Sequence, residues 1–156
     1  RMKPGRVGRA GVVPALLALA ACGGETGTSP TPSPSPTAAA CAAGTPVAVV
    51  SSSKNAEEVL EAAGIRDRFP IVMDGVIAER DHLASKPAPD VFVEAARMLG
   101  VDPARSVAVE DALSGVQSAV AGGFGLVVGV DRGVGADDLT AAGAHIVVQD
   151  LEELVP

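Results

Sequence analysis

Aromatic residues are nearly absent from this 156-residue chain, which has no tyrosine, no tryptophan and only three phenylalanines. Proteins that bind single-stranded nucleic acid usually stack its bases on aromatic side chains, so binding of that kind is not expected. Any hydrophobic core must be filled by aliphatic residues and alanine. A chain of this length ordinarily forms one domain around one core.

Cysteine is also scarce, with Cys22 and Cys41 in the first third of the chain and none afterwards. Neither has a histidine or cysteine partner at the spacing of a zinc site. The absence of cysteine from the rest of the chain suits a reducing cytosol.

Positive charge is scarce after residue 45. Residues 1–45 carry four basic residues and one acidic residue, whereas residues 46–156 carry 8 basic and 18 acidic residues and therefore a net charge of −10. Such a surface repels nucleic acids and anionic membranes. Nucleic acid is therefore not a predicted partner, and any bound phosphate must be held by a local cluster of donors.

The first 22 residues combine a basic start with the apolar run AGVVPALLALA, which is too short to span a bilayer but matches the core of a secretory signal. The sequence LAAC, ending at Cys22, resembles the lipobox of bacterial lipoproteins, in which the cysteine is lipidated. The alternative is GC-rich DNA read in the wrong frame, which also yields such strings and fits a chain that opens with Arg1. Residues 23–44, rich in Ser, Thr and Pro, predict a disordered linker.

From residue 45 to residue 156 the pattern predicts an α/β domain with a parallel sheet. Short β-branched runs at 46–50, 71–74, 106–110, 125–130 and 145–148 predict strands. Apolar residues at helical spacing within 56–63 and 92–99 predict helices with one buried face. Shorter helices are expected near 112–121 and 136–142.

Three polar segments stand out because ligands of parallel sheets lie beyond the carboxyl ends of the strands. The first, Ser51 to Asn55, follows a strand and opens a helix, where hydroxyls, free amides and Lys54 can hold a phosphate. The alternative is simple helix capping, with Asn55 as the cap and Glu58 completing a capping box.

The second segment is SKPAPD, in which Lys86 precedes two prolines that fix the backbone, so that its ammonium group can neutralise a transferring phosphoryl group. The third places Glu110 and Asp111 side by side at the end of an apolar strand, where a hard cation such as Mg²⁺ would relieve their repulsion. In the alternatives, Lys86 is an ordinary surface lysine, Asp111 caps the next helix and Glu110 is solvated.

Taken together, VAVVSSSKN, SKPAPDVFVEAA and SVAVEDALSGVQSA resemble the second, third and fourth motifs of the haloacid dehalogenase (HAD) superfamily, and most closely its beta-phosphoglucomutase-like subgroup. The resemblance covers about residues 42–154, the C-terminal part of such an enzyme. It implies a doubly wound, Rossmann-like core, a hydrolase or phosphomutase of the cytoplasm, a small phosphorylated substrate such as a sugar phosphate, and Mg²⁺ as cofactor.

The resemblance also implies roles for individual residues. Ser51 would hold the transferring phosphoryl group and Lys86 would neutralise it, which makes both catalytic, while Glu110 and Asp111 would hold Mg²⁺. Three further residues would help bind a second phosphate of the substrate: Ser53, Lys54 and Asn55.

The chain departs from the family at its first motif, an apolar strand that ends in Asp-x-Asp-Gly and supplies the nucleophile. Residues 1–45 contain no aspartate, and the helical cap domain that follows this motif is missing as well. We expect an incomplete sheet that lacks its first central strand, although GVVPALLALA could fill the gap despite Pro14. The chain is expected to be truncated and catalytically inactive.

Two other functions stay open at this stage. The chain could be a lipid-anchored, exported module that binds phosphate without catalysis, if residues 1–22 are a genuine signal. It could also be a truncated or frame-shifted product without a function of its own.

The segment IVMDGV, residues 71–76, imitates the missing motif. Asp74 follows a strand and precedes Gly75, but Val72 stands where the first acid of the motif would be, and the segment comes after SSSKN rather than before it. Asp74 is therefore expected to end a strand and form a turn.

Overall fold

The computed structural model describes the backbone of residues 15–18 and the whole of residues 44–154. These residues form a six-stranded parallel sheet in the order β3-β2-β1-β4-β5-β6. The strands are β1 (Ala15–Ala18), β2 (Val47–Val50), β3 (Ile71–Met73), β4 (Ser106–Glu110), β5 (Leu126–Val130) and β6 (Ile146–Val148). The doubly wound parallel class predicted from the sequence is confirmed.

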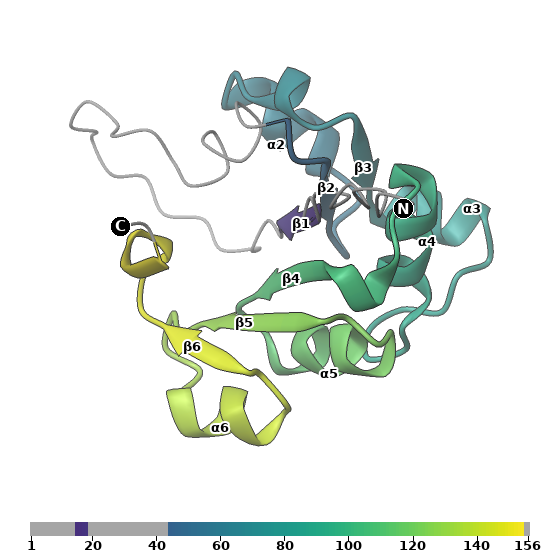
Figure 1. Cartoon of the computed structure of the whole chain (residues 1–156). Coiled ribbons are helices and arrows are strands. Elements are labelled where there is room, and N and C mark those ends of the chain that lie inside the picture. Colours follow the sequence, from purple (N-terminus) through teal and green to yellow (C-terminus); the bar gives the residue numbers. More distant parts are fainter. Residues whose placement is uncertain (1–14, 19–43, 155–156) are drawn as a thin grey trace, which may run out of the picture.

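One part of that prediction is wrong, because the central position of the sheet is not missing. Strand β1 occupies it, with Leu16 opposite Val47 of β2 and opposite Val107 of β4 (Figure 1). The strand as described begins at Ala15, and Pro14 lies outside the described residues. An apolar segment of four residues is enough to pair the two halves of the sheet.

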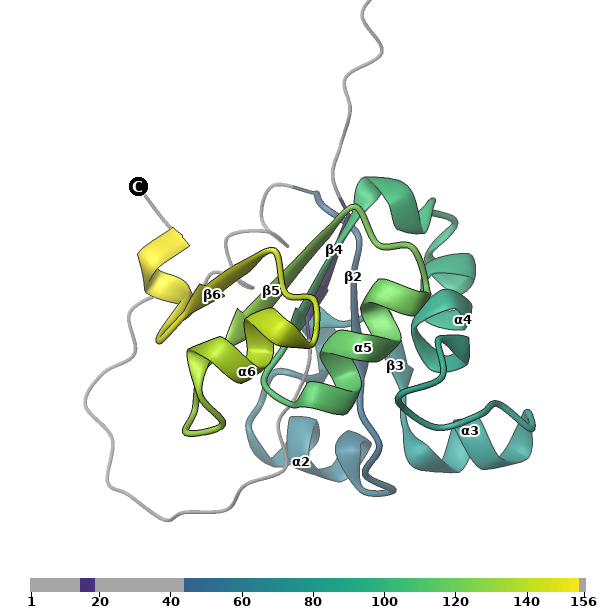
Figure 2. The same cartoon turned by 90° about the horizontal axis from the view of Figure 1, so that it is seen from below.

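Helices connect the strands: α2 (Ala56–Ala62), α3 (Gly75–Arg80), α4 (Asp90–Leu99), α5 (Leu113–Ala121) and α6 (Ala136–Ala141). Short 3₁₀ turns lie at Arg66–Arg68, Pro103–Arg105 and Leu151–Leu154. Helix α2 lies on one face of the sheet and α5 and α6 on the other (Figures 1 and 2). Within the described ranges there is no separate helical domain, and no helix is long and apolar enough to cross a membrane.

The core follows the alternation of side chains along the strands. In β2, Val47 and Val49 pack with Leu60 of α2, while Ala48 and Val50 pack on the opposite face in the main core cluster. That cluster includes Phe92 of α4, which packs edge to face against Phe124 with the two ring centroids 5.5 Å apart. Because both faces of the sheet are covered, the strands read as continuous apolar runs.

Two local predictions fail. Val59, expected on the buried face of α2, is 53% exposed. The turn expected after Asp74 is instead helix α3, because the Asp74 carboxylate accepts hydrogen bonds from the backbone N–H groups of Val76 (3.0 Å) and Ile77 (2.9 Å). The buried Asp74 is a helix N-cap, and a single oxygen, Oδ1, accepts both of these bonds.

Candidate active site

The carboxyl ends of β2 and β4 bring the predicted site residues to one edge of the sheet. Ser51 follows β2 directly and Glu110 ends β4, and both are buried, at 5% and 1% exposure. The Ser51 amide donates to the Met73 carbonyl oxygen (2.8 Å), while its Oγ accepts from the Ser53 amide (3.1 Å). These bonds fix the start of the SSSKN loop against β3.

Lys86 comes from the loop between α3 and α4. That loop is tied down at both ends: Asp90 accepts from the Ala84 amide (3.0 Å), and the buried Ser118 of α5 donates to the Ala88 carbonyl oxygen (2.6 Å). The Lys86–Pro87 peptide bond is cis. The two hydrogen bonds hold the segment that carries Lys86 at both of its ends.

The Lys86 ammonium group forms an ion pair with Oε1 of Glu110, and the two side chains are only 7% and 0% exposed. It also lies 3.5 Å from the Val50 carbonyl oxygen and 5.0 Å from the centre of the Phe92 ring. Lys86 is thus not an ordinary surface lysine, and Glu110 is not solvated. Both alternatives are excluded.

Backbone groups hold the second oxygen of Glu110. Oε2 accepts from the amides of Asp111 (3.2 Å) and Ala112 (3.4 Å). Burial raises the pKa of Glu110, whereas the charge and hydrogen bond of Lys86 oppose that rise. The carboxylate is therefore costly to ionise and depends on its lysine.

Gly115 of α5 makes room for this carboxylate. A Cβ atom at residue 115 would lie 1.9 Å from Cδ and Oε1 of Glu110 and 2.3 Å from Oε2. No side chain fits there unless Glu110 moves. The glycine within the SVAVEDALSG segment thus shapes the site, although the sequence alone did not indicate this role.

The capping alternative is wrong for Asp111 and holds in part for Asn55. Ala112, not Asp111, is the N-cap of α5, and Asn55 caps α2 without a side-chain bond to the helix. Asn55 instead accepts a hydrogen bond from the Ser53 hydroxyl group. Asp111 is therefore not explained by helix capping, and Asn55 stands at the N-cap position without completing the expected capping box.

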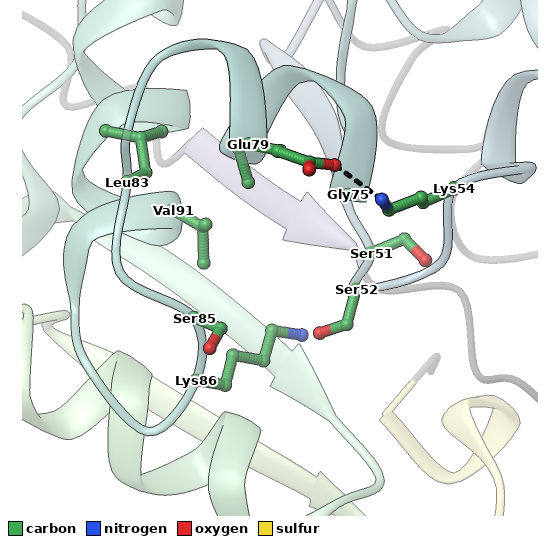
Figure 3. Close-up of a pocket in the computed structure, with 10 residues that line it drawn as sticks. Ser51, Ser52, Lys54, Gly75, Glu79, Leu83, Ser85, Lys86 and Val91 are labelled. Atoms are coloured by element: carbon green, nitrogen blue, oxygen red, sulfur yellow. Dashed lines mark hydrogen bonds and ion pairs between the residues drawn. The ribbon is translucent and has the colours of Figure 1, made fainter.

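A pocket of about 320 Å³ opens beside Lys86. It brings together Ser51, Lys54 and Lys86 of the predicted site (Figure 3). The remaining predicted residues are not part of its lining: Ser53, Asn55, Glu110 and Asp111. The rest of the wall is formed by residues to which the sequence assigned no individual role: Ser52, Gly75, Ala78, Glu79, Leu83, Ser85 and Val91.

Lys54 and Glu79 form an ion pair across one side of the pocket (Figure 3). The bond from Lys54 holds the pKa of Glu79 below its ordinary value. Both side chains are more than half exposed, so the pair can open readily to a ligand. The partners lie 25 positions apart in the sequence, and α3 itself was not predicted, so no local pattern pointed to Glu79.

The donors near Lys86 fit a magnesium ion in part. Glu110 and Asp111 supply carboxylate oxygens, which Mg²⁺ prefers, and it commonly takes only one or two carboxylates, with water and substrate phosphate completing its shell. The part of the chain that the structure describes contains no cluster of three or more acidic, histidine or cysteine residues for a metal. A cation here would thus rely on a bound phosphate for its remaining ligands.

Comparison with known proteins agrees with this geometry. The family model described as haloacid dehalogenase-like hydrolase matches residues 17–123, and the chain belongs to this family. It is 49% identical over 117 residues to a beta-phosphoglucomutase of Mycobacterium bovis, which covers 72% of this chain and 44% of that protein. The beta-phosphoglucomutase-like subgroup inferred from the sequence is thereby confirmed.

Two solved structures share the fold. A HAD family hydrolase from Deinococcus radiodurans, with bound phosphate and sodium, is 30% identical with a TM-score of 0.65, covering 76% of this chain and 56% of that one. A variant of CbbY from Rhodobacter sphaeroides, in complex with xylulose-1,5-bisphosphate, is also 30% identical, with a TM-score of 0.64 and coverage of 78% and 56%. The chain thus spans about half the length of the relatives it matches.

Proposed function

We propose that residues 44–154 form the phosphate-binding half of a phosphoryl-transfer site for a small phosphate ester, such as a sugar phosphate. The observation that carries the proposal is the convergence of Ser51 and Lys86 on one pocket, with the Glu110 carboxylate directly behind Lys86. A hydroxyl donor and a nearly buried ammonium group are what a phosphate dianion requires in a site that excludes water.

Each side chain has a distinct part in this proposal. The Ser51 hydroxyl donates to a phosphoryl oxygen and Lys86 offsets its charge. Lys54 of the SSSKN loop, with Ser53 and Asn55 behind it, takes a second phosphate of the substrate at the other side of the pocket. The bisphosphate bound by the CbbY relative supports a substrate with two such groups.

In this proposal Glu110 and Asp111 would hold a magnesium ion. When bound, the ion would supply positive charge to the phosphoryl oxygens.

We further propose that the 156-residue chain binds the ester without transferring its phosphoryl group. The resemblance to the family implies that phosphoryl transfer needs an aspartate nucleophile ahead of the SSSKN loop. Residues 1–45 contain no aspartate. Asp74 does not replace it, because its carboxylate accepts two amide hydrogen bonds of α3.

Two measurements test the proposal. Inorganic phosphate and a panel of sugar phosphates should bind the purified chain, and Lys86→Ala should weaken that binding by about tenfold or more, the size of a lost charged hydrogen bond. Arg97→Ala, which removes an exposed cation on α4, is the control of equal charge and should leave binding unchanged. If both variants weakened phosphate binding equally, the loss would come from the change in net charge, and a specific contact of Lys86 with phosphate would be disproved.

A phosphatase assay with Mg²⁺ tests the second part. The chain should release phosphate no faster than the buffer. Turnover that Glu110→Ala abolishes would show that another group serves as nucleophile and would overturn the proposed inactivity.

A further inference from the structure

The Lys86 ammonium group and the Glu110 carboxylate are each other's main polar partner. Oε1 of Glu110 is taken by Lys86 and Oε2 by two amides, while Lys86 has only the more distant Val50 carbonyl oxygen and the Phe92 ring besides. The two residues that would receive the anion and the cation of a substrate complex therefore neutralise each other in this structure.

The packing around the pair keeps it closed. Gly115 leaves the space at the start of α5 that the Glu110 carboxylate occupies, and the Glu110 side chain has no exposed surface. Lys86 is held by the loop that Ser118 and Asp90 fix. Glu110 therefore has no route to solvent, whereas Lys86 reaches the pocket wall with only 7% of its side chain exposed.

Opening this pair for one ion alone is unfavourable. A phosphate that drew Lys86 away would leave Glu110 buried without a cation, and a cation that drew Glu110 away would leave the ammonium group without an anion. A buried charge that has lost its partner is strongly destabilising. When both ions arrive, Lys86 and Glu110 each exchange one partner for another, and no charge is left uncompensated.

We propose that phosphate and a divalent cation bind this site as a coupled pair, each raising the affinity for the other, because either must open the Lys86–Glu110 ion pair. This inference rests on the proposed function and adds how the site is controlled. Thermodynamic linkage requires the effect to be reciprocal: the factor by which Mg²⁺ strengthens phosphate binding equals the factor by which phosphate strengthens Mg²⁺ binding.

Calorimetric titration of the whole chain tests the coupling directly. Inorganic phosphate is titrated with and without Mg²⁺, and Mg²⁺ with and without phosphate, at constant ionic strength and with the heat of magnesium phosphate formation in buffer subtracted. Both affinities should rise about tenfold or more in the presence of the other ion, within the usual range of coupling between sites.

Glu110→Gln tests the cause of the coupling. The amide leaves Lys86 without its anion, so phosphate should bind this variant more tightly than it binds the wild type without Mg²⁺, and Mg²⁺ should no longer change that affinity. Glu94→Gln removes one carboxylate from the pair with Arg97 on α4 and should keep the full coupling.

The possible outcomes are distinct. Equal phosphate affinity with and without Mg²⁺ in the wild type would overturn the coupling and leave phosphate binding intact. No phosphate binding under either condition would overturn the proposed function and the coupling together. The wild-type titrations decide the matter even if Glu110→Gln does not fold.

Discussion

The ammonium group of Lys86 and the carboxylate of Glu110 meet across the carboxyl end of the sheet, and both are almost fully withdrawn from solvent. One comes from the loop ahead of α4 and the other from the end of β4, so their contact joins the two halves of the domain. Its energetic consequences can be measured without any ligand.

Replacement of Lys86 by methionine should destabilise the domain by about 3–5 kcal/mol near neutral pH, because Glu110 would be left buried without its cation. The loss should depend on pH. Burial already raises the pKa of Glu110, and the variant removes the lysine that opposes this rise. Since the folded state then binds the proton more tightly than the unfolded state, stability should fall as pH rises from the ordinary glutamate value of 4.5 through the raised pKa.

Urea unfolding of this variant between pH 5 and pH 8, roughly the range in which folded proteins are most stable, provides the measurement. The matched control is Lys86→Met combined with Glu110→Gln, which has no carboxylate to protonate and should show no such slope from this site. A loss that stays constant over the range would mean that lost packing, rather than the unpaired charge, dominates.

Replacement of Gly115 by alanine should displace the Glu110 carboxylate, because the new Cβ would overlap it. We expect a loss of about 1–3 kcal/mol, as for other overpacked cores, together with weaker phosphate binding. In a Glu110→Ala background the overlap with these three atoms disappears. There the same replacement should be neutral or stabilise α5 by up to about 1 kcal/mol, the helix propensity of alanine over glycine. Equal losses in the two backgrounds would disprove the steric explanation.

Replacement of Asp74 by alanine should cost about 0.5–2 kcal/mol through the loss of the N-cap of α3. Asp74→Asn keeps an oxygen acceptor and should retain most of that stability. Chemical denaturation of both variants is sufficient to compare them. If the chain has phosphatase activity that the asparagine variant abolishes, Asp74 has a chemical role that the structure does not indicate.

Replacement of Glu79 by glutamine should release Lys54 from its ion pair at the side of the pocket. Phosphate affinity should rise a few-fold, because the ligand no longer competes with a carboxylate. The thermal unfolding temperature should stay unchanged, since the pair is exposed. Asp81→Asn removes a nearby exposed carboxylate that pairs with Arg80 instead, and it should leave the affinity unaltered.

Much of the sheet could be predicted from the sequence, because strands buried on both faces leave uninterrupted β-branched runs such as VAVV and LVVGV. The central strand was harder to predict, since ALLA lacks β-branched residues and follows a proline. Helix α3 was missed because Gly75 directly after a strand indicates a turn, and only the carboxylate geometry of Asp74 distinguishes a turn from a helix cap.

Candidate site residues could be predicted where they stand at the carboxyl end of a strand, as Ser51 does after β2 and Glu110 does as the last residue of β4. Contacts between distant segments left no local pattern. The ion pair of Lys86 with Glu110 spans 24 residues, and the fit of Gly115 against Glu110 depends on the path of α5. Physical proximity of this kind results from packing, which periodicity in a single sequence does not record.

Strand β1 has a further consequence for protein design. Its parallel pairing with β2 and β4 fixes its direction, so its carboxyl end opens on the same edge as Ser51 and Glu110. The carboxyl end of β1 therefore lies between the strand that leads to Ser51 and the strand that ends at Glu110. A designer who wished to alter the chemistry at this edge of the sheet would rebuild the segment after Ala18 and keep the described strands intact.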